Sequence, residues 1–313
     1  MYTTILIETV NVTGPIFVLV ILGLILRRIG FLNDQFVEVS TKLVFSICLP
    51  LLLFTVIIRI DETLNVKVFN FSIVACCITF ALSWLIAVLL VYPKEDRGVF
   101  VQACFRSNLG VVGLALCANA FGKEGLALAS LLMASMTVTY NILSVFILSF
   151  YNAKQSVSFG GVIVDITKNP LIVSICLALI VAFFEIPVPS VVLSTGEYLG
   201  SMALPLALLG CGAGMNLKTL RRASKTTFLG VVMKTAILPI VITALAIALG
   251  FQGVVLGVLF LLFVSPTATA SFIMVKSMGG NDTLAANLIM TTTLVSILTS
   301  SVGLFLLKIL SFV

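Results

Sequence analysis

Long apolar stretches alternate along the chain with short breaks that carry charged residues, glycine or proline. An apolar stretch of about 20 residues is long enough to cross a bilayer as a helix, and the breaks are too short to hold a soluble domain. The pattern therefore predicts an all-α polytopic membrane protein with ten transmembrane helices. These helices are predicted over residues 12–28, 38–58, 69–92, 98–121, 125–150, 170–186, 190–215, 227–249, 252–275 and 283–310.

The composition agrees with this fold class. Hydrophobic residues make up 60% of the 313 positions and charged residues 10%, whereas a soluble domain carries about 25% charged residues. The first apolar stretch lacks a basic segment before it and a small-residue cleavage site, so we expect it to be retained as the first helix.

The basic residues collect on one side of the predicted membrane. When the connections are assigned to alternate sides, the richer side holds Arg27, Arg28, Lys42, Lys94, Arg97, Lys154, Lys168, Lys218, Arg221, Arg222, Lys225 and Lys276. The other side holds Arg59, Lys67, Lys123 and Lys308. The positive-inside rule makes the richer side cytoplasmic, which predicts a multi-pass protein of the cell (inner) membrane with both termini extracytoplasmic. The net charge of +6 then belongs to loops beside the lipid bilayer, and no nucleic-acid partner is expected.

Several kinds of chemistry find no support in the sequence. It has no histidine, and its seven cysteines lie in apolar stretches without a CxxC pair, so we expect neither a metal site nor a disulfide. No HExxH, DDxxD or GxSxG motif is present, so an enzyme is not expected. The acidic residues fall in or near connections and helix ends, Glu197 being the nearest to a helix interior. No cofactor is expected, and coupling to a proton or sodium gradient stays open.

The two halves of the chain, residues 1–151 and 152–313, resemble each other. "GPIFVLVILGLIL" aligns with "NPLIVSICLALIV" and "LPLLLF" with "LPLALL" at an offset of 155, and "KEGLALASLL" aligns with "NDTLAANLIM" at an offset of 158. The first two alignments superpose Pro15 on Pro170 and Pro50 on Pro205. Each half holds five predicted helices, and an odd number requires the second copy to enter the membrane from the opposite face. Such inverted-topology repeats are typical of secondary transporters.

The fourth and ninth predicted helices contain residues that interrupt helices. At the offset of 158, "RSNLGVVG" aligns with "VSPTATAS", so Asn108 falls on Pro266. Proline removes a backbone donor, and serine, threonine and asparagine side chains compete for or rescue backbone groups. Broken helices direct the positive ends of half-helices at an anion near the centre of the membrane. The candidate substrate-binding residues are Arg106, Ser107, Asn108, Gly110, Ser265, Pro266, Thr267 and Thr269.

The same residues also have purely structural interpretations. Pro266 can be a plain kink, and Asn108 can form an ordinary hydrogen bond between helices. Arg106 lies about two turns from Arg97, so its side chain can extend to the cytoplasmic surface instead of facing a substrate. Lys234 has the same ambiguity because it lies near the basic connection "NLKTLRRASKT". The sequence does not decide between these interpretations.

The chain resembles bacterial members of the auxin efflux carrier family, within the bile/arsenite/riboflavin transporter-like superfamily. The residues that carry the resemblance are "ICLPLLLF", "FRSNLGVVGLAL", "KNPLI", "ALPLALLGCGAG", "SPTATASFIM" and "GGNDTLAANL". One departure is Ala115, which stands where the family usually has a proline after the fourth-helix asparagine. The long hydrophilic central loop of many plant members is also missing.

This resemblance implies a 5+5 inverted repeat of ten helices with crossed, broken fourth and ninth helices. It implies a scaffold (residues 12–58 and 170–215) that forms a homodimer, and a transport unit (residues 69–150 and 227–310) that moves in elevator fashion. The implied substrates are small organic anions, with Asn108 in contact with the substrate and Pro266 at the second crossover.

The sequence thus predicts a secondary transporter of small organic anions such as mono- or dicarboxylates. The alternative is a sodium-coupled symporter of the bile-acid carrier type, which would need carboxylate and amide ligands at the crossing. A non-transporting membrane sensor is disfavoured because no soluble segment is present to receive a signal.

Overall fold

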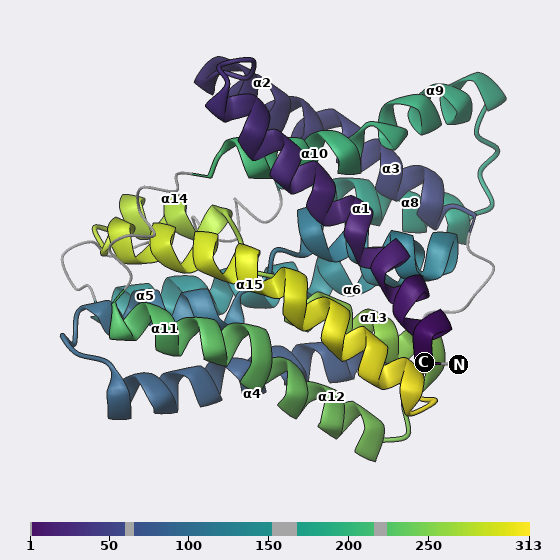
Figure 1. The fold of residues 1–313 in the computed structure, drawn as a ribbon. Coiled ribbons are helices and arrows are strands. Elements are labelled where there is room, and N and C mark those ends of the chain that lie inside the picture. The colour runs from purple at the N-terminus through teal and green to yellow at the C-terminus, as the bar shows by residue number, and fades with distance from the viewer. Residues whose placement is uncertain (1, 60–65, 152–167, 216–223) are drawn as a thin grey trace.

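The computed structural model describes residues 2–59, 66–151, 168–215 and 224–313, and within these ranges the fold is all-helical with no β-strand (Figure 1). The prediction of an all-α, multi-pass membrane protein is confirmed at this level. Seven described stretches are long and apolar enough to span a membrane: Thr3–Arg28, Asp34–Ile57, Val66–Leu90, Leu109–Tyr151, Ser190–Ala213, Lys225–Ala248 and Asp282–Ile309. Two shorter apolar helices cover Pro170–Phe183 and Gly253–Val264. The boundary between the predicted halves, and Lys154, Lys218, Arg221 and Arg222, lie at or within the segments outside the described residues.

The helices follow one another along nearly the whole described chain (Figure 1). In order they are α1 (Tyr2–Arg28), α2 (Asp34–Leu43), the π-helix η1 (Val44–Cys48), α3 (Leu49–Ile57), α4 (Val66–Leu90), α5 (Asp96–Phe105), the π-helix η2 (Leu109–Gly113), α6 (Leu114–Tyr151), α8 (Pro170–Phe183), α9 (Ser190–Ser201), α10 (Ala203–Ala213), α11 (Lys225–Val232), the π-helix η4 (Met233–Ile237), α12 (Leu238–Ala248), α13 (Gly253–Val264), α14 (Ala270–Ser277) and α15 (Asp282–Ile309).

The helices pack in two groups that draw on both halves of the chain. Helix α1 packs on α10, and α3 packs on α8 and α9, in the upper part of Figure 1. Helix α4 packs on α5 and α6, α11 packs on α15, and α13 packs on α6, α12 and α15. The groups meet where α1 contacts α6 and α15 and where α3 contacts α6. The chain ends lie side by side in Figure 1. Near these ends, Lys308 Nζ of α15 lies 3.1 Å from Glu8 Oε2 of α1.

Two of the long helical stretches widen into a π-helix that ends two residues before a proline. The π-helix η1 precedes Pro50, and η4 precedes Pro239. A proline inside a helix removes one backbone donor and clashes with the carbonyl one turn earlier. The wider turn moves that carbonyl away, and each proline lies in the first turn of the next α-helix, where its missing N–H does no harm.

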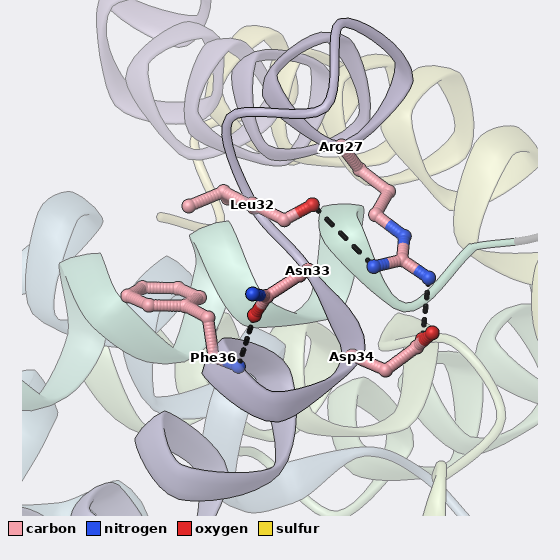
Figure 2. A network of polar contacts seen from close by, with 5 residues as sticks. All are labelled: Arg27, Leu32, Asn33, Asp34 and Phe36. Carbon is pink, nitrogen blue, oxygen red and sulfur yellow. Dashed lines mark hydrogen bonds and ion pairs between the residues drawn. The ribbon is translucent and has the colours of Figure 1, made fainter.

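The connection from α1 to α2 is fixed by side chains (Figure 2). Arg27 donates from Nη1 to the carbonyl oxygen of Leu32 (3.4 Å) and forms an ion pair with Asp34. Asn33 Oδ1 accepts from the backbone N–H of Phe36 at 2.8 Å, which caps the first turn of α2. Arg27 therefore supports the reversal of the chain between α1 and α2.

Helix α6 changes direction at Gly122. This residue has φ 59° and ψ −143°, a conformation that is essentially restricted to glycine. The predicted boundary between the fourth and fifth membrane helices, at residues 121–125, falls at the same place.

Helices α1 and α10 approach closely through glycine. A Cβ atom added to Gly212 would lie 1.8 Å from the carbonyl oxygen of Val20, and one added to Gly23 would lie 2.1 Å from that of Leu209. Small residues at such contacts let helix backbones pack closely in a membrane, where hydrophobicity alone does not hold helices together.

We predict that Gly212→Ala destabilises the protein by about 1–3 kcal/mol, because the new methyl group must push α1 away from α10. Gly210→Ala is the matched control, since its Cβ would meet nothing closer than Ser40 Oγ at 3.8 Å. The apparent melting temperature in detergent checks both variants. Equal melting temperatures for the two variants would contradict close packing at Gly212.

Candidate functional site

Two helix breaks lie against each other at the centre of the fold. Helix α5 ends at Phe105 and the chain becomes helical again at Leu109, while α13 ends at Val264 and α14 begins at Ala270. The backbone N–H of Asn108 donates to the Pro266 carbonyl oxygen at 2.7 Å, and that of Ala268 donates to the Arg106 carbonyl oxygen at 3.1 Å. Ser107 and Thr267 form an antiparallel bridge between these bonds. The two interrupted segments therefore satisfy each other's backbone groups.

The bridge makes Asn108 and Pro266 neighbours in space, joined by a backbone hydrogen bond. The repeat alignment, which superposes Asn108 on Pro266 at an offset of 158, stays a prediction, because an antiparallel bridge forms in the same way with or without a repeat.

Hydroxyl groups satisfy the backbone around the second break. Thr267 Oγ1 donates to the carbonyl oxygen of Ala103 at 2.7 Å, near the end of α5. The backbone N–H of Thr267 donates to Thr292 Oγ1 of α15 at 3.1 Å, and Ser265 Oγ donates to the Leu261 carbonyl oxygen at 2.7 Å. An unpaired backbone group in an apolar interior is costly, so these bonds make the break tolerable.

Lys234 extends from η4 into the crossing. Lys234 is only 2% exposed. Its Nζ donates to Ser107 Oγ at 2.5 Å and to the Phe263 carbonyl oxygen at 3.3 Å. The Phe263 carbonyl belongs to the last turn of α13, where a cation is favoured by the helix dipole. The structure therefore places Lys234 inside the protein, and not at the surface beside the basic connection.

Arg106 is also buried, at 8% exposure. Its Nη1 donates to Ser144 Oγ of α6 at 3.2 Å and lies 2.9 Å from Met274 Sδ of α14. The guanidinium group is thus held between two helices, which does not agree with a side chain extended to the cytoplasmic surface. Tyr140 of α6, also buried, lines the same cavity as Ser107 and Arg106.

The buried site carries positive charge without a carboxylate beside it. No Asp or Glu is buried in the described part of the chain, where the ion pairs are Arg27–Asp34, Arg59–Glu197 and Lys308–Glu8. A third buried cation, Arg97, donates to the Val88 and Val91 carbonyl oxygens at the end of α4. Burying a cation is unfavourable unless an opposite charge or good hydrogen bonds compensate it. The crossing is therefore suited to an anion.

Two cavities border the crossing. The smaller one, about 340 Å³, is lined by Arg106, Ser107, Asn108, Tyr140 and other residues of α6, the second break and the start of α8. The larger one, about 900 Å³, lies between α2, η1 and α10 on one side and α14 and α15 on the other. Asn108 and Thr269 line both cavities. Both half-helices that follow the breaks begin at these two residues, so partial positive charge points toward the cavities.

The predicted site residues divide into two sets. Arg106, Ser107, Asn108, Gly110 and Thr269 line a cavity. Ser265, Pro266 and Thr267 line neither, and their backbone or hydroxyl groups hold the crossing together.

Two residues at the crossing, Lys234 and Tyr140, are not among the predicted site residues. The sequence feature that points to Lys234 is a charged side chain inside an apolar stretch. No sequence feature points to Tyr140, since a tyrosine among apolar residues is common in membrane helices.

The fold and the site together define a multi-pass membrane protein with a buried cationic site at two paired helix breaks. The family described as membrane transport protein matches the chain over residues 10–160 and 154–304, so the chain belongs to this family. An uncharacterized transporter of Methanocaldococcus jannaschii is 23% identical over 219 residues, covering 66% of this chain and 68% of the relative. An uncharacterized transporter of Methanothermobacter thermautotrophicus is 25% identical over 243 residues, covering 76% and 78%. These similarities indicate a transport protein rather than an enzyme.

We predict that Ser107→Ala destabilises the protein more than Lys234→Met. Removing the Ser107 hydroxyl leaves the ammonium group buried with one acceptor fewer, at a cost of about 1–3 kcal/mol. Lys234→Met replaces the buried cation with an apolar side chain of similar length, which is often neutral or stabilising. Apparent melting temperatures in detergent check the order. A Lys234→Met variant that melts well below Ser107→Ala would make Lys234 a structural cap of α13 and no more.

Proposed function

We propose that this protein is a secondary transporter of small organic anions, such as mono- or dicarboxylates, that works by elevator-type alternating access. The observation that carries the proposal is the pair of buried cations, Arg106 and Lys234, at a crossing bordered by two cavities. A buried basic side chain in a membrane-embedded protein is expensive and marks an ion or substrate pathway. A transported anion compensates the charge each time it binds.

The proposed architecture has ten membrane helices in a 5+5 inverted repeat. The stretch Leu109–Tyr151 supplies parts of two helices because α6 turns at Gly122. Helix α5 joined to η2, and α13 joined to α14, are the fourth and ninth helices, each broken at the crossing. The paired breaks support this assignment, since discontinuous helices at a repeat interface form the binding sites of such transporters.

The proposed moving parts follow the two packing groups. The scaffold (residues 12–58 and 170–215) contains α8, α9 and α10 and most of α1 to α3, and we propose that it also forms a homodimer. The transport unit (residues 69–150 and 227–310) contains the crossing. Between described residues, polar contacts join α1 to the transport unit: Asn119 Nδ2 donates to the Val12 carbonyl oxygen at 2.6 Å, Ser301 Oγ donates to Thr13 Oγ1 at 2.8 Å, and Lys308 pairs with Glu8. Such contacts can break and re-form as the transport unit slides.

The larger cavity supports a proposal for the orientation of this conformation. It is lined near the start of α2, the end of α10 and the start of α15. These ends adjoin the connections that carry Arg28, Lys225 and Lys276, on the side with more basic residues. The positive-inside rule makes that side cytoplasmic, so we propose an inward-facing state of an inner-membrane protein with both termini outside.

We predict that Asn108→Ala abolishes counterflow of labelled mono- and dicarboxylates in proteoliposomes. Asn108 lines both cavities at the start of a half-helix, so its loss removes the amide at the point the substrate must pass. Asn70→Ala, at an exposed position on α4, is the matched control and should transport as the parent protein does. Wild-type counterflow in a folded Asn108→Ala variant would remove Asn108 from the substrate path.

The same assay tests the charge and the coupling ion. Arg106→Gln should raise the half-saturating concentration of the transported anion by about tenfold or more, because a charge-assisted hydrogen bond is lost. An unchanged half-saturating concentration would contradict a contact between Arg106 and the substrate.

Parallel runs with imposed proton or sodium gradients identify the driving ion. A strict sodium requirement would favour the alternative, a symporter of the bile-acid carrier type.

A further inference from the structure

The first half of α1 meets α6 and α15 at one end of the boundary between the scaffold and the transport unit. Polar contacts between described residues join the helices there, and we call this set of contacts the α1 seam. The seam consists of Asn119 with the Val12 carbonyl oxygen, Ser301 with Thr13, and Lys308 with Glu8.

The α1 seam and the larger cavity lie at opposite ends of α1. Figure 1 shows α1 running from the paired chain ends, where the seam lies, toward α2. The larger cavity lies beyond the other end, between α2, α10, α14 and α15. Within the seam, Thr9 and Thr13 are 1% and 2% exposed. The boundary is therefore closed at the seam in the conformation that has the cavity at the other end.

Backbone contact fixes α1 to α10 of the scaffold. Gly23 and Gly212 leave no room for a methyl group against the carbonyl oxygens of Leu209 and Val20. Backbones packed so tightly transmit a displacement rather than absorb it. A movement between the scaffold and the transport unit must therefore part α1 from α6 and α15, which means that the seam must open.

The hydroxyl groups of the seam each have a second partner in their own helix. Ser301 Oγ lies 2.8 Å from Thr13 Oγ1 and also 2.8 Å from the Ile297 carbonyl oxygen, one turn earlier in α15. Its single hydrogen can serve either acceptor. Thr13 Oγ1 donates to the Thr9 carbonyl oxygen of α1 at 3.0 Å. When the helices part, each hydroxyl keeps a hydrogen bond, so opening strands no buried polar group.

The other seam contacts can also be released at low cost. Asn119 is exposed, and the side chains of Glu8 and Lys308 are 56% and 23% exposed, so water replaces their partners after separation. The crossing differs, because its bonds join the buried backbone of Asn108 and Ala268 to the opposite break. Parting the breaks would leave these groups unpaired in an apolar interior. The weakest polar boundary is therefore the seam, and the crossing moves as one piece.

We propose that the α1 seam is the extracytoplasmic gate of this protein, and that the Thr13–Ser301 hydroxyl pair is the latch that holds it shut. In the outward-facing state the latch is open, with Ser301 bonded to Ile297 and Thr13 to Thr9. This inference rests on the proposed function, since it names the part of the boundary that opens during alternating access.

A disulfide across the latch tests the gate. Thr13→Cys combined with Ser301→Cys places two thiols where the hydroxyl oxygens are in contact, so mild oxidation should join them. The matched control is Ser72→Cys combined with Ser135→Cys. The Ser72 and Ser135 hydroxyl oxygens lie 3.3 Å apart and join α4 to α6 inside the transport unit.

We expect the cross-link at positions 13 and 301 to reduce counterflow in proteoliposomes at least tenfold, with recovery after reduction. The cross-link at positions 72 and 135 should leave counterflow within twofold of the parent protein, because both ends move together. Mass spectrometry of the joined peptides measures the extent of each cross-link. Full counterflow through protein that is completely cross-linked at positions 13 and 301 would overturn the inference.

A second measurement needs neither transport nor a cross-link. Thr9→Cys places a thiol on the buried face of α1 one turn before Thr13, and leaves the latch intact. In lipid nanodiscs, a membrane-impermeant methanethiosulfonate should modify this thiol only when the seam opens. Adding Ser301→Ala should speed the modification about two- to tenfold, because one hydrogen bond across the gate is lost. Thr299→Ala is the control, since Thr299 Oγ1 bonds within α15, to the Val295 carbonyl oxygen.

Equal modification rates at position 9 in the Ser301→Ala and Thr299→Ala variants would overturn the latch, and a thiol there that stays unmodified while transport proceeds would overturn the gate. Failure of the proposed function gives a different result. No carboxylate would then show counterflow through the parent protein, whereas the modification at position 9 does not depend on transport.

Discussion

The structure depends on how two helix breaks satisfy their backbone groups in an apolar interior. Each break frees N–H and C=O groups in a largely apolar interior, where each unpaired group costs several kcal/mol (about 2–7 by transfer measurements). The two hydrogen bonds of the antiparallel bridge at Ser107 and Thr267 pair four of these groups directly. Hydroxyls of Thr267 and Thr292 satisfy others. Neither break is stable alone, so the two halves of the chain must meet here.

The charge of the site follows from the same arrangement. A break exposes a helix C-terminus that favours a cation, and Lys234 fills this role at the Phe263 carbonyl. The half-helices beyond the breaks begin at the cavities with their positive ends. Arg106 adds a second buried cation held by a hydroxyl and a sulfur atom. Under the proposed function, an anion that enters the cavities meets a site already arranged for it, which is how a binding site gains affinity without reorganisation.

The sequence predicted the helical fold and the two breaks because both depend on local chemistry. Apolar runs define membrane helices, and Pro266, Asn108 and their hydroxyl neighbours mark interruptions. The pairing of Ser107 with Thr267 could not be read from the sequence, because it joins segments about 160 residues apart whose apolar neighbours match in many alignments. The position of Lys234 depends on how η4 directs its side chain toward distant segments, which no local pattern records.

The most direct test of the paired breaks is a disulfide between positions 107 and 267. Residues opposite each other in such a bridge have Cα atoms about 4.5 Å apart, within the range that a disulfide can span. Ser107→Cys combined with Thr267→Cys should form the cross-link under mild oxidation in the membrane, detected by mass spectrometry of the joined peptides, and Ser107→Cys alone should not produce it. If both introduced thiols stay reduced and separately alkylatable in the inserted protein, the crossing does not exist as described.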